Sequence, residues 1–259
     1  MTALIKSFKQ VTSLLRTFGL KETLRRALYY SASVMFGEKL YQKPIIDCIV
    51  KHAKGYPTFI DIGAYRGIIT IAVSNLFEQC IAIEPIPENF LYLLHNVSIH
   101  GVKNCILLPL ALGEEPGVKM MYYNPLNPDT ASLLPSSSPR SLKRLVKVGT
   151  LDGVIKMSGA KDPYLIKIDV QGYEFKVMKG GKETLKKECL IISEFWPFGL
   201  RSAGDNPLQY IQFMKELGYQ VCNLQGLPLA KSELSRLCLL GLRDPFIVTD
   251  ILFVKRRHP

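Results

Sequence analysis

The chain has 259 residues, of which 47% are hydrophobic and 21% are charged, and its mean hydropathy is +0.12. These values exclude a disordered chain and allow one α/β domain with additions. The six cysteines form no C-x-x-C pair and no cluster with histidine, so the sequence predicts no metal site and reduced thiols, as in a cytoplasmic protein. No apolar run is long enough for a membrane-spanning helix, and the N-terminus lacks the pattern of a signal peptide.

The net charge of +11 is concentrated in three basic patches, within residues 1–30, 140–147 and 255–257. Such patches attract nucleic acid, anionic lipid or acidic glycans with little discrimination. Residues 1–44 predict a basic amphipathic helical segment that precedes a domain over 45–259, because apolar side chains from Leu4 to Phe18 recur at helical spacing. This segment either packs as a cap on the sheet domain or contacts a membrane surface or a partner.

The first strand of the predicted sheet leads into a glycine loop. Phe59, Ile60 and Ile62 form an apolar run without alternation, which is typical of a strand buried on both faces. The run contains Asp61 near its end, and the spaced glycines that follow allow a tight turn close to a ligand. We expect a nucleotide-binding loop, although its spacing departs from the G-x-G-x-x-G pattern of dinucleotide sites.

The next elements complete a β-α-β unit. Residues 68–77 are rich in β-branched side chains, but the context of a nucleotide loop predicts a helix there. A second buried strand, 80–84, ends in Glu84, which the unit brings to the same sheet edge as Asp61 and which can accept hydrogen bonds from a ribose. A helix from Pro87 to about His100 and a strand over 105–110 follow.

The sequence predicts a turn and a loop in the middle of the chain, followed by alternating strands and helices in its second half. We expect a polar turn at 111–117 and, over 124–148, a lid or substrate loop or else a disordered insertion. The predicted elements after it are a strand at 164–169 with one lysine among apolar residues, a helix at 173–187, a strand at 190–195, a helix from Asn206 to Gly218, and strands at 219–224 and 250–255.

Several of these motifs together resemble one family. The block Ile166-Lys-Ile-Asp-Val-Gln-Gly-Tyr-Glu174 is similar to the signature of the FkbM methyltransferases, and Asp61 to Gly67, Glu84-Pro85 and the segment Ala111 to Gly117 match in the same order. The resemblance implies a class I, Rossmann-like α/β fold with a seven-stranded mostly parallel sheet and helices on both faces. It also implies an S-adenosylmethionine-dependent O-methyltransferase. Tyr65 and Gln171 depart from the family's usual Asn and Glu, so contacts at these two positions are in doubt.

The resemblance also assigns the site residues. The expected cofactor-binding residues are Asp61, Gly63, Ala64, Gly67, Glu84, Pro85, Ala111 and Asp169. The acids expected at the reacting edge, any of which can be the base, are Asp169, Glu174 and Glu194. For Glu174 there is an equal alternative to a catalytic role: it can be an acid at a helix N-terminus, where the helix dipole favours a negative charge.

The acceptor is not encoded in any of these motifs. We expect a hydroxyl on a small molecule, lipid or glycan. The alternatives are a nucleic-acid methyltransferase, which only the basic patches favour, and a cofactor-binding or membrane-docking module without turnover. The sequence has no paired aromatic motif for reading nucleic-acid bases, so we expect no specific nucleic-acid partner.

Overall fold

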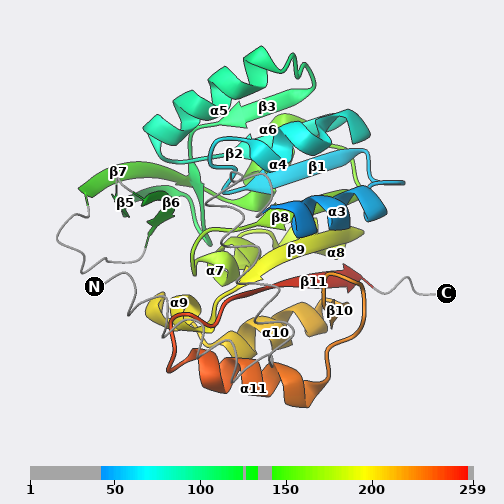
Figure 1. Ribbon diagram of the computed structural model, residues 1–259, viewed down its shortest axis with the longest axis vertical. Helices are drawn as coiled ribbons and strands as arrows, with labels where there is room; N and C mark the ends of the chain where they lie inside the picture. The colour runs from blue at the N-terminus through cyan, green and yellow to red at the C-terminus, as the bar shows by residue number, and fades with distance from the viewer. Residues whose placement is uncertain (1–41, 125–126, 134–141, 256–259) are drawn as a thin grey trace.

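The computed structural model describes residues 42–124, 127–133 and 142–255, and a seven-stranded sheet forms its centre (Figure 1). The strand order is β10-β11-β9-β8-β1-β2-β3. The strands are β1 Thr58–Ile62, β2 Gln79–Ile83, β3 Cys105–Leu108, β8 Tyr164–Ile168, β9 Cys189–Phe195, β10 Tyr219–Cys222 and β11 Thr249–Lys255. All neighbours are parallel except the pairs of β11, which runs against β9 and β10. The predicted class I fold is confirmed.

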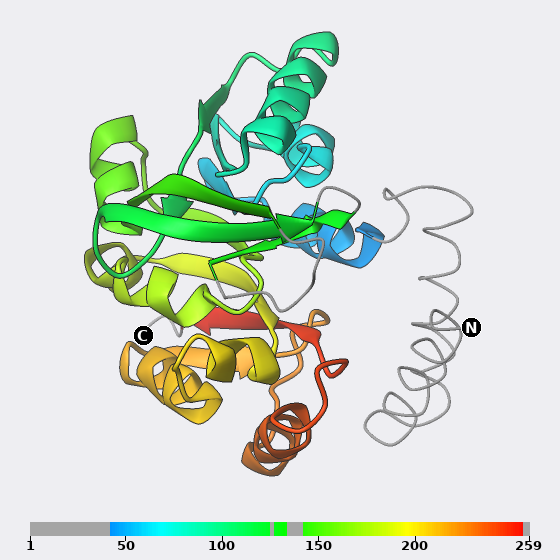
Figure 2. The same cartoon turned by 90° about the vertical axis from the view of Figure 1, so that its left-hand side faces the viewer.

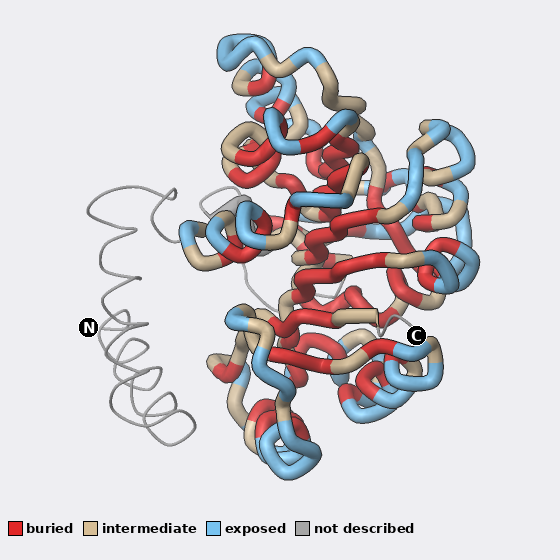
Figure 3. Tube along the Cα trace, turned by 90° about the vertical axis from the view of Figure 1, so that its right-hand side faces the viewer, coloured by how far each residue is buried: buried red, intermediate tan, exposed pale blue. Residues whose placement is uncertain are grey.

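Helices cover both faces of this sheet. They are α3 Lys43–His52, α4 Ile68–Val73, α5 Pro87–Ile99, α6 Leu151–Ser158, α7 Glu174–Lys179, α8 Lys182–Lys186, α9 Pro197–Ser202, α10 Pro207–Glu216 and α11 Lys231–Gly241, with a 3₁₀ turn at Ser74–Leu76. Phe59 points to the cluster under α3 and α4, whereas Ile60 and Ile62 point to the cluster under α6 to α8, α10 and α11. The central strands are therefore buried on both faces (Figure 3), as the unbroken apolar runs predict.

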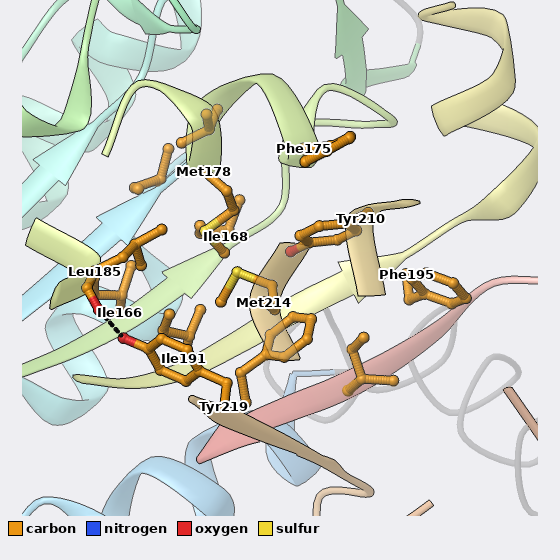
Figure 4. Close-up of a cluster of buried hydrophobic side chains, with 14 of the residues drawn as sticks. Ile166, Ile168, Phe175, Met178, Leu185, Ile191, Phe195, Tyr210, Met214 and Tyr219 are labelled. Carbon is orange, nitrogen blue, oxygen red and sulfur yellow. Dashed lines mark hydrogen bonds between the residues drawn. The ribbon is translucent and has the colours of Figure 1, made fainter. Parts of the chain in front are cut away.

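The larger cluster fixes the helices that follow β8 and β9 (Figure 4). Tyr210 of α10 stacks on Phe175 of α7 with ring centroids 5.4 Å apart. Tyr219 at the start of β10 donates a hydrogen bond of 3.1 Å to the carbonyl of Leu185 in α8. These contacts hold the segment after β8 against the rest of the core, and this segment carries part of the site.

The predicted single helix over 173–187 is wrong, because the segment forms two short helices broken at Gly180 and Gly181. An added Cβ at Gly180 would lie 2.0 Å from the carbonyl oxygen of Gly113, and one at Gly181 would lie 2.7 Å from a methyl carbon of Leu151. The break lets neighbouring chain approach closely. Helices α6, α9 and α11 were not predicted.

A second correction concerns residues 111–117, predicted as a polar turn, and residues 124–148, predicted as a loop. Its described residues form a second sheet in the order β4-β7-β5-β6, with β4 Ala111–Leu112, β5 Gly117–Asn124, β6 Asn127–Ser132 and β7 Leu142–Gly149. One face buries Met121, Tyr123, Val146 and Val148 against Ile86 and Ala111. Figure 2 looks at this side of the molecule, where the small sheet lies across the foreground. A lid over 124–148 is therefore wrong for the described residues.

The predicted N-terminal helical segment lies outside the described residues except for Gln42 to Pro44, where α3 begins. In the described part of the chain, no helix is long and apolar enough to cross a membrane, and no group of three or more His, Cys, Asp or Glu could hold a metal ion. The six cysteines are free thiols.

Candidate functional site

Four of the predicted site residues form one row across the sheet. Ile62 of β1 pairs with Ile83 of β2 and with Ile168 of β8, and Ile168 pairs with Ser193 of β9. The residues one position further along these strands are Glu84, Gly63, Asp169 and Glu194, in that spatial order. Parallel strands thus bring the three acids and the glycine loop to one carboxyl edge, which is where open α/β sheets bind ligands.

The glycine loop is held by both neighbouring strand ends. Gly63 has φ +80°, and an added Cβ would lie 1.9 Å from the carbonyl oxygen of Asp169, so only glycine fits there. The amides of Gly63 and the buried Ala64 both donate to the carbonyl of Ile83 at 3.0 Å. Gly67 has φ +85° and precedes α4, with Leu93 of α5 packed against it. The loop is therefore preformed by the protein's own contacts.

Asp61 lies beneath this loop and is 1% exposed. Its Oδ2 accepts a hydrogen bond of 2.6 Å from the hydroxyl of Thr70 in α4. Its Oδ1 accepts no hydrogen bond from the described residues and lies 3.5 Å from the ammonium of Lys167 in β8. Asp61 thus ties the strand before the loop to the helix after it, and its predicted contact with a cofactor stays a prediction.

Lys167 lies between two of the predicted site carboxylates. Its ammonium donates to the carbonyl of Gly63 at 3.1 Å and lies 3.6 Å from Oδ2 of Asp169. Burial by itself lowers the pKa of this lysine, but Asp61 and Asp169 outweigh that effect and hold the pKa above its usual value. Lys167 is therefore the positive centre of a buried ion-pair network, in which each partner compensates the desolvation of the others.

Glu84 follows β2 and is 4% exposed. Its carboxylate accepts hydrogen bonds from the amides of Tyr65 at 3.0 Å and Ile86 at 2.9 Å, and from the amide side chain of Asn89 at 3.3 Å. Burial raises the pKa of Glu84 to about 7, although these donors oppose the rise. Glu84 thus binds the glycine loop to α5, and its predicted contact with a ribose stays a prediction.

Pro85 and Ala111 lie on the side of Glu84 that faces the small sheet. Pro85 is half-buried between Glu84 and Ile86. Ala111 lies in β4, pairs with Val148 of β7 and packs in the same cluster as Ile86. These two residues border the site through the backbone and the small sheet, and their predicted contact with a cofactor stays a prediction.

Glu174 is fully buried and faces the backbone of the turn after β8. Its Oε1 accepts hydrogen bonds from the amides of Val170 at 3.1 Å and Gly172 at 3.0 Å. Its Oε2 has no hydrogen-bond partner in the part of the chain that the structure describes. Burial raises the pKa of Glu174 to about 7, and Asp169 adds to the rise. This side chain holds the turn in shape, and it has no exposed surface for an acceptor.

Asp169 and Glu194 are joined through Gln171, which occupies the turn with φ +54°. Its side-chain amide donates to Oδ1 of Asp169 at 2.8 Å and approaches the oxygens of Glu194 at 3.4 and 3.5 Å. Burial raises the pKa of Glu194 well above its usual value, and the negative charges of Asp169 and Glu174 raise it further. The side chain of Asp169 is 29% exposed, so this acid is open to solvent.

The sequence interpretation missed three residues that build this site, Lys167, Thr70 and Asn89, and it also missed the role of Gln171 as a hydrogen-bond donor. For Lys167 a signal was present, since a lysine inside an apolar strand needs a buried carboxylate partner. Thr70 and Asn89 carry no such signal, because a single threonine or asparagine on a predicted helix is equally compatible with an exposed position, although their partners Asp61 and Glu84 lie only nine and five residues away.

Comparison with known proteins identifies a family. A search of curated proteins found no match. Among solved structures, the chain is similar to cofactor-bound Rv0187 from MTB, at 12% identity and a TM-score of 0.48, covering 95% of this chain and 94% of that one. It is also similar to the O-methyltransferase TomG from Streptomyces achromogenes in complex with SAM, at 9% identity and a TM-score of 0.45, covering 84% and 81%.

The family model described as the methyltransferase FkbM domain matches residues 61–221. This range begins at Asp61 and ends within β10, so it includes every residue of the carboxyl-edge row. The chain therefore belongs to the FkbM family of S-adenosylmethionine-dependent methyltransferases.

Proposed function

We propose that this methyltransferase transfers the methyl group of S-adenosylmethionine to a hydroxyl oxygen of a small molecule, a lipid or a glycan. The observation that carries the proposal is the solvent-accessible carboxylate of Asp169, in the row beside the glycine loop and joined through Gln171 to Glu194. A hydroxyl is a poor nucleophile until its proton is removed, and a positioned carboxylate can accept that proton.

The residues of the carboxyl edge fit S-adenosylmethionine. This cofactor carries a ribose diol, an ammonium and a sulfonium, which all favour carboxylate partners. In this proposal Glu84 accepts from the ribose through Oε2, which binds one amide, whereas Oε1 already accepts from two donors. Asp61, Gly63, Ala64 and Gly67 give the loop its shape, and Pro85 and Ala111 border the same edge.

Methyl transfer requires few chemical steps from the protein's own residues. The bound cofactor supplies an electrophilic methyl group for an in-line displacement, so alignment of the acceptor oxygen is the main task. In this proposal Asp169 accepts a hydrogen bond from the acceptor hydroxyl and takes its proton as the oxygen attacks. The raised pKa of Glu194 favours its protonated form, which limits the build-up of negative charge at the edge, and the side-chain amide of Gln171 donates to both carboxyl groups and holds them in place.

Glu174 has a positioning role in this proposal. Its carboxylate holds the amides on both sides of Gln171, so it fixes the turn that places Asp169 and Gln171. We do not assign Glu174 as the base, because its side chain is 0% exposed and faces the backbone of the turn.

A labelling experiment tests the proposed function. The full-length protein is incubated with S-adenosylmethionine carrying a labelled methyl group and with separate extracts of hydroxylated small molecules, lipids, glycans and RNA. We expect label on a hydroxyl oxygen in one of the first three, and loss of most turnover in Asp169→Asn without loss of cofactor binding. Asp47→Asn is the matched control, since Asp47 is an exposed acid paired with Lys43 in α3. Label in RNA alone, or an unchanged rate in Asp169→Asn, would overturn the proposal.

A further inference from the structure

The outer face of the small sheet carries apolar side chains next to lysines. In β5 and β7 the residues Met121, Tyr123, Val146 and Val148 point to the inner cluster. Because side chains alternate along a strand, Val118 and Met120 of β5 and Leu145 of β7 point the other way. They are 63%, 39% and 66% exposed, respectively.

These side chains form one patch and are not scattered singly. Met120 pairs directly with Leu145, and Val118 lies two residues along the same face. The cross-strand partners at the two ends of the patch are lysines: Val118 pairs with Lys147, and Tyr122 pairs with Lys143. Contiguous exposed apolar surface of this kind marks an interaction site more often than isolated exposed residues do.

The two lysines are exposed and keep their charge available. Among the described residues, no acid forms an ion pair with Lys143 or Lys147, whereas Arg144, on the opposite face of β7, pairs with Glu88 at 2.8 Å. The ammonium of Lys143 lies 5.8 Å from the ring centroid of Tyr122. The patch therefore combines aliphatic side chains, one tyrosine and two unneutralised cations on a single face.

We propose that this face, formed by Val118, Met120, Tyr122, Lys143, Leu145 and Lys147, docks on an anionic phospholipid membrane. Aliphatic side chains enter the boundary between headgroups and acyl chains, tyrosine prefers the interfacial layer, and lysines bind lipid phosphates. RNA fits the face less well, because RNA recognition relies on stacking platforms and arginine rather than on exposed valine, methionine and leucine. The proposal does not depend on the identity of the methyl acceptor.

The side of the small sheet opposite to this face contacts the segment after β8. Ser132 of β6 donates to the carbonyl of Gln171 at 2.9 Å, and Lys119 of β5 donates to the hydroxyl of Tyr173 at 2.7 Å. The small sheet thus contacts the turn that follows β8 directly.

A charge test uses the full-length protein and vesicles made of phosphatidylcholine and phosphatidylglycerol in equal amounts. Removal of two lysines from the contact, in Lys143→Gln with Lys147→Gln, should weaken vesicle binding roughly 30-fold. The matched control is Lys215→Gln with Lys231→Gln, which removes the same charge from exposed positions of α10 and α11. An equal effect of both pairs would mean that net charge alone drives binding and would overturn the proposal.

A depth test reports on the face itself, so that membrane contact elsewhere in the chain cannot imitate it. Leu145→Trp places a fluorophore in the patch, and Leu239→Trp places one at a similarly exposed site of α11, where leucine is 61% exposed. Brominated lipids should quench the tryptophan at 145 and not that at 239, with Trp196 as the shared background. Equal quenching, no quenching, or binding of RNA in place of vesicles would each refute membrane docking by this face.

Discussion

The hydrogen bond between Thr70 and Asp61 should contribute strongly to stability, and Thr70→Val is the substitution that removes it. Valine keeps the shape of threonine and replaces the hydroxyl by a methyl group. Both residues are buried, at 0% and 1% exposure, and the bond is 2.6 Å long. Without it, Asp61 accepts no hydrogen bond that the structure describes, and only the ammonium of Lys167 at 3.5 Å compensates its charge.

The expected magnitude follows from this environment. A hydrogen bond to a charged group contributes about 1.5–3 kcal/mol, and a buried charge left without its donor lies at the upper end, so we expect a loss of about 3 kcal/mol. For a chain of this size, each kcal/mol corresponds to a change in Tm of about 2–4 °C, which gives a fall of roughly 6–12 °C. Cofactor affinity should fall as well, because Asp61 positions the strand that leads into the glycine loop.

Thermal and urea unfolding of the wild type, Thr70→Val and Thr70→Ser measure this effect. Serine keeps the donor and loses one methyl group, so Thr70→Ser should lose about 1 kcal/mol or less. If Thr70→Val unfolded like the wild type, or if Thr70→Ser lost as much stability as Thr70→Val, the hydrogen bond would not hold Asp61 as described.

Three further predictions concern the same edge of the sheet. Glu84→Ala should weaken S-adenosylmethionine binding by about 3 kcal/mol in calorimetry and also lower Tm, since Glu84 holds two backbone amides; unchanged affinity in a folded variant would remove Glu84 from the site. Lys167→Met should cost about 3–5 kcal/mol in urea unfolding, because Asp61 and Asp169 lose their common cation; a smaller effect than that of Lys215→Met would contradict the network. Glu174→Gln should remove part of the pH dependence of stability. The pKa of about 7 in the folded state lies above the ordinary carboxyl value of 4.5, so the folded state binds an extra proton and wild-type stability falls as the pH rises from about 4.5 to about 7; parallel pH profiles of the two proteins would refute this assignment.

The local pattern of the sequence encoded most of the large sheet. Strands β1, β2, β8 and β9 lie where uninterrupted apolar runs predicted them, because a strand covered on both faces has no solvent side to mark with polar residues. The glycine spacing also predicted the loop correctly, since Gly63 and Gly67 both adopt positive φ angles. The helix at Ile68–Val73 formed against its β-branched composition, because packing on the core outweighs propensity.

The small sheet was missed because its strands are separated by proline- and serine-rich segments that resemble a loop. Its alternation is visible only in hindsight: Met121 and Tyr123 are buried, whereas Val118 and Met120 are exposed. A face that remains open to solvent but carries valine, methionine and leucine breaks the usual alternation of apolar and polar side chains. The outer face of the small sheet, whose apolar residues hid the strand pattern, is the face proposed to contact the membrane.

By itself, the sequence determined the buried strands, the glycine loop and the acids at the strand ends, because these depend on short-range patterns of burial and backbone conformation. Only the tertiary structure decided which groups meet. Lys167 lies between Asp61 and Asp169 because β1 and β8 are neighbours in the sheet, and Glu174 faces the turn amides because α7 packs on the larger core cluster. Lys167 and Asp61 lie far apart in the chain, the contacts of Glu174 depend on the path of the turn, and the energies of both depend on desolvation in the folded core, which no local pattern specifies.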